Sequence, residues 1–231
     1  KTAGMSDLTG NEKKNGFYAA IPVFIVTAAL LIRLTALAAK SLYVDEGVTV
    51  FICQRPLASI VPLMMEISEV HPPLYFWLVN IWMGLWKTIG IALSYTVWLR
   101  LSSVLFGVLS VWLTYCLARR LVGEKAALLA SGFLALSSFH VYYSQELRMY
   151  PLLLTLMLSS FLLFLMMVEK LTVLRGIGLA VVTGAALLIH YYAFYIIMIE
   201  VLWGVYLFVG FRSGRLLGEA AGAAGAGAEG S

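Results

Sequence analysis

Long apolar segments dominate this sequence and constrain its fold more than any other feature. Six runs are candidate membrane spans: Phe17–Ala39, Leu101–Ala118, Ala126–Val141, Leu152–Val168, Val173–Ile189 and Ala193–Phe211. A membrane-spanning helix needs about 20 mostly apolar residues. Hydrophobic residues make up 61% of the chain and charged residues 12%, whereas soluble domains have roughly 45–50% apolar and about 25% charged residues. We therefore predict an all-α integral membrane protein, a polytopic bundle of about six transmembrane helices.

A seventh apolar run, Leu74–Trp86, is shorter and carries three tryptophans. Trp and Tyr gather at the membrane–water interface. We interpret this run as a helix lying on the membrane surface rather than a span. A seven-span arrangement stays open, because the following segment Thr88–Leu99 is also uncharged.

The placement of charges favours the six-span arrangement. If Leu74–Trp86 does not cross, one face receives most of the basic residues: Lys13, Lys14, Arg119, Arg120, Lys125, Lys170, Arg175, Arg212 and Arg215. Cytoplasmic loops carry such an excess of Lys and Arg. We therefore predict a multi-pass plasma-membrane protein with a cytoplasmic N-terminus. Residues from about 40 to 99 would form the first outer loop, with juxtamembrane surface helices.

The two ends of the chain differ in composition from the apolar middle. We expect residues 1–16 to be a tag remnant and a cytoplasmic N-terminus, with Met5 as the native start. The tail at 218–231 is almost entirely Gly, Ala and Glu, as in a linker or tag. Residues 17–217 would then form the membrane module.

Four polar clusters fall on the predicted outer face. They are Asp45-Glu46-Gly47, His71-Pro72-Pro73, Tyr142 to Tyr150, and His190-Tyr191-Tyr192. The inner loops are short and basic and hold no comparable cluster. This asymmetry predicts one site, assembled from separate loops and open to the outer leaflet.

Each cluster also has a purely structural interpretation. Adjacent acids after a span often mark a solvated boundary, although uncompensated charge next to apolar residues is costly. His71 could simply begin a helix, and the tyrosines could form an interfacial belt. We expect Arg33, inside the first run, to extend its charged group to the interface or to pair with an acid such as Glu200.

The segment around Arg148 is the most informative chemically. A guanidinium is a planar, permanently charged fork suited to phosphate, and His190 could add a donor. A cationic, aromatic-lined pocket at headgroup level suits an anionic lipid whose tail stays in the bilayer. A nearby exposed carboxylate could deprotonate an attacking hydroxyl. These features predict group transfer from a lipid-phosphate donor.

At these residues the sequence resembles the C-type glycosyltransferase superfamily, in the branch of the dolichyl-phosphate-mannose protein mannosyltransferases and aminoarabinose lipid A transferases. The similar segments are Ser41–Glu46, His71–Tyr75, Arg100–Gly107, Tyr142–Tyr150 and His190–Tyr192, in the family's order. The resemblance covers roughly Phe17–Leu217, the membrane module. It implies membrane glycosyltransferase activity in cell-envelope glycosylation.

The resemblance also implies roles for individual residues. Asp45 would be the general base that activates an acceptor, which displaces the polyprenyl phosphate with inversion at the sugar. Glu46 would support Asp45 or contact the acceptor. Residues expected to bind the donor or its phosphate are Arg148, His190, Gln145, Glu146, Tyr191 and Tyr143. His71 and Tyr150 would be structural or lie on the acceptor side.

The implied partners are a polyprenyl-phosphate-linked sugar, an acceptor that could be protein, lipid or glycan, and membrane lipids. No basic stripe indicates nucleic acid. The branch works without metal, and Ser144-Gln145-Glu146 replaces the paired acids of relatives that use a divalent ion, so we expect no cofactor and do not favour a metal.

Family members usually continue for several more spans. We therefore expect a truncated chain, which would bind lipid phosphate and be inactive if part of the site is missing. The alternative is a non-enzymatic lipid-phosphate-binding or scaffold module. A small-molecule transporter is less favoured, because the sequence has no inverted repeat.

Overall fold

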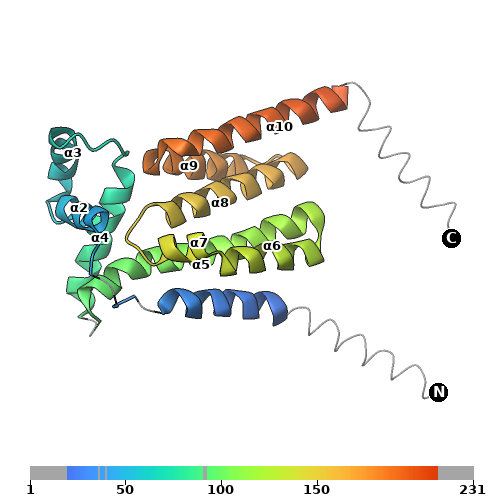
Figure 1. Ribbon diagram of the computed structural model, residues 1–231. Coiled ribbons are helices and arrows are strands. Elements are labelled where there is room, and N and C mark those ends of the chain that lie inside the picture. Colours follow the sequence, from blue (N-terminus) through green and yellow to red (C-terminus); the bar gives the residue numbers. More distant parts are fainter. Residues whose placement is uncertain (1–19, 36, 40, 91–92, 213–231) are drawn as a thin grey trace, which may run out of the picture. The chain divides into compact units, whose positions relative to one another are not determined.

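All regular elements in the described part of the chain are helices. The computed structural model describes residues 20–35, 37–39, 41–90 and 93–212 (Figure 1). The chain divides into two compact units, Lys1–Tyr191 and Tyr192–Ser231. The predicted tag remnant at 1–16 and the predicted tail at 218–231 lie outside the described residues. The prediction of an all-α membrane protein is confirmed.

The first unit holds nearly all of the helices. It begins with the helix Ala20–Leu34 and continues with α2 (Val44–Cys53), α3 (Leu57–Glu66), α4 (Leu74–Ile89), α5 (Tyr95–Val122), α6 (Glu124–Leu136), α7 (Ser138–Ser144), α8 (Tyr150–Glu169) and α9 (Val173–Ile189). The short turn η1 (Tyr191–Ala193) leads into α10 (Phe194–Arg212), the helix of the second unit.

Each predicted span falls in a helical region, but their lengths differ. In the described part of the chain, three helical segments are long and apolar enough to cross a membrane: Tyr95–Val122, Tyr150–Glu169 and Tyr191–Gly210. The pair α6 and α7 would make a fourth if the two helices form one bent span. Ala20–Leu34, α9 and part of α4 are shorter apolar helices. The count of six spans therefore stays a prediction.

The predicted first outer loop contains three helices, as expected. α4 packs against α2, α3 and α5, and Figure 1 shows these short helices gathered near the start of α5. Trp82 of α4 and Trp98 of α5 stack at 4.3 Å. Each indole N–H donates to the other residue's carbonyl, at 2.8 and 2.9 Å. This reciprocal pair fixes α4 on α5, where sequence reasoning expected an interfacial aromatic belt.

The connection between α4 and α5 is short and well capped. Gly90 ends α4 in the left-handed region with φ 65°, a conformation that glycine adopts without steric cost. Ser94 then starts α5 by accepting a hydrogen bond from the backbone N–H of Val97. Gly90 thus defines the end of α4 and Ser94 the start of α5.

Arg33 corrects one expectation, because its side chain does not extend to the interface. It is fully buried. The guanidinium donates to the carbonyls of Ala135 and Leu134, at 3.2 and 3.4 Å, and lies 2.5 Å from His140 Nδ1. These contacts lie where Ser137 separates α6 from α7 with a 60° bend. Arg33 therefore satisfies backbone groups that the break leaves without helical partners.

Candidate functional site

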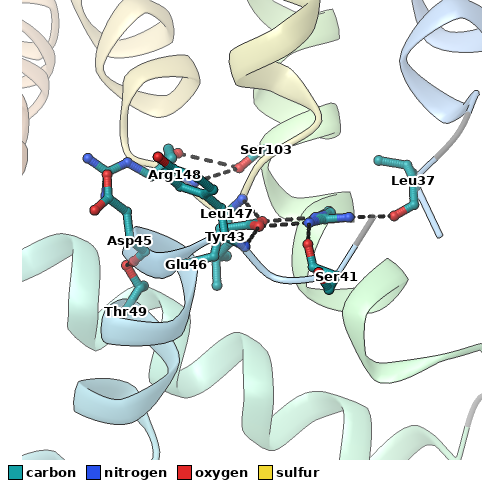
Figure 2. Close-up of polar contacts among 10 residues, drawn as sticks. Leu37, Ser41, Tyr43, Asp45, Glu46, Thr49, Ser103, Leu147 and Arg148 are labelled. Atoms are coloured by element: carbon teal, nitrogen blue, oxygen red, sulfur yellow. Dashed lines mark hydrogen bonds and ion pairs between the residues drawn. The ribbon is translucent and has the colours of Figure 1, made fainter. Parts of the chain in front are cut away.

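Glu46 anchors the start of α2 to two distant parts of the first unit. Figure 2 shows its carboxylate at the centre of a hydrogen-bond network. Arg100 of α5 donates to it twice, through Nε at 2.8 Å and Nη2 at 2.7 Å. The backbone N–H of Leu147 donates at 2.8 Å. The N–H of Tyr43 donates at 2.9 Å, as in the capping box of a helix N-terminus.

This network keeps Glu46 ionised. Burial alone would raise the pKa of its carboxyl, but the hydrogen bonds from Arg100 and the backbone outweigh burial and lower that pKa. Arg100 also donates to the carbonyls of Leu37 and Ser41, at 2.7 and 3.1 Å. The pair therefore joins α2, α5, the segment after the first helix and the loop between α7 and α8.

Asp45 has a different environment from its neighbour. Its Oδ2 lies 3.3 Å from Arg148 Nη1, and its side chain is 54% exposed, against 15% for Arg148. Successive residues of a helix point about 100° apart. Glu46 therefore faces the interior while Asp45 remains accessible. The structure thus brings together the predicted base and the predicted phosphate ligand.

Arg148 is held from several directions. Its backbone N–H and carbonyl both lie 3.4 Å from Ser103 Oγ on α5. Its guanidinium lies 5.5 Å from the ring centroid of Tyr150, and Nη2 donates to the Tyr150 hydroxyl at 3.4 Å. These contacts orient a half-buried cation, which is favourable for binding an anion.

An aromatic cluster continues from Tyr150. Its ring lies 4.8 Å from that of Tyr143 and 6.2 Å from that of His190. His190 lies 5.1 Å from His71 and 4.4 Å from Tyr191. The predicted residues Tyr143, Tyr150, His190, His71 and Tyr191 therefore form one connected cluster next to Arg148.

The two histidines of this cluster differ in their surroundings. His71 Nδ1 lies 2.5 Å from the carboxylate of Glu69. His190 is buried, and burial lowers its pKa, with further lowering from the charges of His71 and Arg148. His190 is therefore neutral near pH 7 and can donate from only one ring nitrogen.

The predicted donor residues Gln145 and Glu146 lie elsewhere. The side-chain amide of Gln145 donates to the carbonyls of Ile32, Arg33 and Thr35, at 3.3, 3.3 and 2.7 Å. These bonds tie α7 to the end of the first helix. Both residues line a separate cavity of about 600 Å³ that also includes Glu46 and Arg100. The structure does not place them with the cluster around Arg148.

An apolar groove has Arg148 among its lining residues. Its volume is about 220 Å³, and its lining comes from α4, α5 and the start of α8: Tyr75, Leu78, Val79, Ile81, Trp82, Leu85, Ser102, Ser103, Phe106, Arg148 and Leu152. Tyr75 is buried, and its hydroxyl is one of the side-chain groups without a hydrogen-bond partner in the described structure. A buried hydroxyl normally has a partner, so Tyr75 could donate to a ligand beside Arg148.

Sequence reasoning missed several of these groups. Arg100 was noticed only within a segment of family resemblance, and Tyr75 and Ser103 were not assigned a role. One signal in the sequence could have identified Arg100. It is a basic residue at the start of an apolar helix, where a charge requires a partner. Among the described residues, no group of three or more His, Cys, Asp or Glu is placed to hold a metal ion.

A family model described as dolichyl-phosphate-mannose-protein mannosyltransferase matches residues 70–222, more than half of the chain. The matched range contains His71, Tyr75, Arg148 and His190 and begins after Asp45 and Glu46. No curated protein matches the chain.

Proposed function

The chain belongs to the dolichyl-phosphate-mannose-protein mannosyltransferase family, and from that premise we propose that it moves a sugar from a polyprenyl-phosphate donor to an acceptor beside Asp45. Members of this family are membrane glycosyltransferases of the C type that use polyprenyl-phosphate-linked sugars. The observation that carries the proposal is the Asp45–Arg148 pair, in which Arg148 lines the apolar groove. The family name makes mannose the first sugar to test.

The groove and Arg148 suit the two ends of such a donor. The apolar lining of α4 and α5 would hold the first prenyl units. The phosphate would accept hydrogen bonds from Arg148 and from the Tyr75 hydroxyl. Charge-assisted hydrogen bonds of this kind are shorter and stronger than neutral ones. His190 would add a neutral donor, and Tyr143 and Tyr191 would close the aromatic wall around the sugar.

Asp45 would act as the general base. In the proposed reaction an acceptor O–H attacks the anomeric carbon, its proton passes to an Asp45 carboxylate oxygen, and the new C–O bond forms with inversion. The bond from the anomeric carbon to the phosphate oxygen breaks, and its electron pair stays on the polyprenyl phosphate. Arg148 and Tyr75 stabilise the charge that develops on that leaving group.

Donor binding would also prepare the base. In the Asp45–Arg148 ion pair the Asp45 side chain is 54% exposed and that of Arg148 is 15% exposed, so water reaches the carboxylate and weakens the attraction between the two charges. A phosphate entering the groove can therefore replace Asp45 as the partner of Arg148. The carboxylate is then released beside the sugar, where it can accept a proton. Glu46 would support this step by holding the first turn of α2 in place.

The orientation in the membrane belongs to the same proposal. The charge distribution supports a cytoplasmic N-terminus and a site on the outer face. Residues from all four predicted polar clusters lie together at this site, which supports a single outer site. A donor linked to a membrane lipid would reach Arg148 laterally, through the groove between α4 and α5.

Donor binding tests the proposal first. Purified protein in mild detergent is titrated with polyprenyl phosphate and with neutral polyprenol, and binding is measured by native mass spectrometry. We expect selective binding of the phosphate, and a loss of about 10-fold or more in Arg148→Ala, since hydrogen bonds to charged groups contribute about 1.5–3 kcal/mol. Arg55→Ala is the control, because Arg55 also lies near an aromatic ring, that of Phe51, but is exposed and does not line the groove. Equal affinity in Arg148→Ala would place the phosphate elsewhere.

Asp45→Asn separates binding from chemistry. We expect donor affinity to be retained or increased, since the carboxylate no longer competes for Arg148. Transfer of labelled mannose from its polyprenyl-phosphate donor into membrane acceptors should fall about 10²–10⁴-fold, the usual contribution of a general base. Retained turnover would remove Asp45 as the base.

A further inference from the structure

A second cationic region lies at the other end of α5. Arg100 and Arg119 are 19 positions apart on this helix, which corresponds to about 28 Å along its axis. The hydrocarbon core of a bilayer is about 30 Å thick. Arg119 is therefore placed near the opposite membrane interface from the candidate active site.

Four helix ends gather cations at this interface. The end of α5 packs near the start of α6 and the end of α8, and α8 packs on α9. The basic side chains are Arg119, Arg120, Lys125, Lys170 and Arg175, and the acids are Glu124 and Glu169. The cations outnumber the acids, so the region carries a net positive charge that would attract an anion.

Within this region the structure contains a defined cleft. Its volume is about 370 Å³, and it is lined by Trp112, Tyr115, Cys116, Arg119 and Arg120, within the range of about 300–1,000 Å³ for small-ligand sites. The rings of Trp112 and Tyr115 lie 5.4 Å apart. The guanidinium of Arg119 lies 5.9 Å from the Tyr115 ring centroid. The cleft thus combines a cation with an aromatic wall.

Arg119 is the exchangeable cation of the cleft. Arg120 is paired with Glu169 through two of its nitrogens. Arg119 pairs with Glu124 at 2.9 Å through Nε alone, and the two side chains are 62% and 35% exposed. An exposed pair of this kind contributes little stability. A phosphate can therefore replace Glu124 as the partner of Arg119 without disturbing the fold.

The surroundings indicate a ligand that is itself in the membrane. Large apolar side chains are exposed at the same helix ends, namely Val122, Leu171, Val173 and Leu174, and Trp112 is exposed beside the cleft. Trp and Tyr favour the headgroup level of a bilayer. The cleft lies along one face of α5, and clusters of basic residues next to a membrane attract anionic headgroups.

We propose that this cleft binds the phosphate headgroup of an anionic phospholipid. Arg119 contacts the phosphate, and Trp112 and Tyr115 cover the glycerol and the first part of an acyl chain. This site is separate from the groove at Arg148 and belongs to the opposite leaflet. It would anchor the ends of α5, α6 and α8 to that leaflet.

The experiment compares lipids by native mass spectrometry of the full chain in mild detergent. The protein is titrated with phosphatidylglycerol and with zwitterionic phosphatidylcholine. We expect preferential binding of phosphatidylglycerol and affinity about five-fold weaker in Arg119→Gln, since one basic residue contributes about 1 kcal/mol. Arg119→Lys should keep most of the affinity. Arg55→Gln and Arg148→Ala should not change it, which separates this site from the proposed donor site.

Three outcomes would overturn the proposal. One is equal affinity for the two lipids, and another is unchanged affinity in Arg119→Gln. The third is displacement of phosphatidylglycerol by millimolar inorganic phosphate, which would indicate a site for a soluble anion. Thermal unfolding in neutral detergent accompanies each variant. We expect the unfolding temperature of Arg119→Gln to equal that of the wild type. A loss of lipid binding in this variant then results from the change in the cleft and not from a change in the fold.

Discussion

Asp45 and Glu46 are adjacent in the sequence and have opposite surroundings. Glu46 is buried and accepts four hydrogen bonds, from Arg100, Leu147 and Tyr43. Asp45 is half exposed and paired with Arg148. The sequence identified the pair as unusual, because both acids stand among apolar residues. The family resemblance made Asp45 the base and gave Glu46 a supporting or acceptor-side role. The sequence did not indicate the partner of Glu46, since Arg100 lies 54 positions away.

Glu46→Gln should destabilise the protein. Removing the carboxylate leaves Arg100 as an uncompensated buried charge, and breaking a buried pair typically costs about 3–5 kcal/mol. Thermal unfolding in detergent measures the loss. Glu66→Gln is the matched control, because Glu66 is an exposed acid of the same loop. An unfolding temperature equal to that of the wild type would show that the network contributes little.

Lowering the pH should remove the stabilisation that the Glu46 carboxylate contributes to the folded state. Its folded-state pKa lies below the ordinary value of 4.5, so the folded state binds the proton less tightly than the unfolded state does. Its contribution to stability is therefore fully present above about pH 4.5 and is lost as pH falls through the lower, folded-state pKa. The difference in unfolding temperature between wild type and Glu46→Gln should shrink over that range. If the difference in unfolding temperature does not change with pH, the stabilisation comes from the packing of the Glu46 side chain and not from its charge.

At the scale of helices, the hydrophobic runs predicted where the helices lie. They did not predict where a helix is interrupted. The predicted span Ala126–Val141 is mostly apolar and holds no Asp, Glu, Lys or Arg, yet the chain bends by 60° at Ser137. No proline or glycine marks the bend. It depends on Arg33, which donates to the carbonyls of Leu134 and Ala135. Such a contact between helices about 100 residues apart cannot be read from local pattern.

Gly107 allows α7 to approach α5. A Cβ at this position would overlap Ser144 Oγ and lie 2.7 Å from Ser144 Cβ. Gly107→Ala should therefore lower the unfolding temperature, because overpacking costs about 1–3 kcal/mol. Gly132→Ala is the control, since a Cβ there meets nothing within 4 Å and alanine favours helix.

A second substitution tests the cause of that loss. Ser144→Gly removes the two nearest atoms that the new methyl group would meet, and leaves Arg33 Nε at 3.3 Å. In the double variant Gly107→Ala with Ser144→Gly, we expect stability above the sum of the two single effects, as residues in contact are not additive. Additive losses would show that close packing of Gly107 against Ser144 is not the reason.

At the scale of the whole molecule, the apolar composition predicted a membrane protein, and the polar motifs predicted the family. Which of the predicted site residues lie together depends on tertiary contacts. Asp45, Arg148, His71, Tyr150 and His190 were selected from four separate clusters, and the structure brings them into one connected region. Gln145 and Glu146 were selected with them because they are neighbours of Arg148 in sequence. At a helix end, however, neighbouring side chains point in different directions, and Gln145 instead holds the first helix.

The arrangement of the helices in the membrane makes a final prediction. Glu66, at the end of α3, is exposed near the candidate site, and Leu171, between α8 and α9, is exposed near the opposite end of α5. In a background with Cys116 replaced by alanine, we expect Glu66→Cys to react with an impermeant maleimide on intact cells. Leu171→Cys should react only after permeabilisation, because the positive-inside rule places its basic neighbours in the cytoplasm.

Burial raises the pKa of the Cys53 thiol, so Cys53 should remain unreactive. Labelling of both positions from one side would contradict a bundle that crosses the membrane between them.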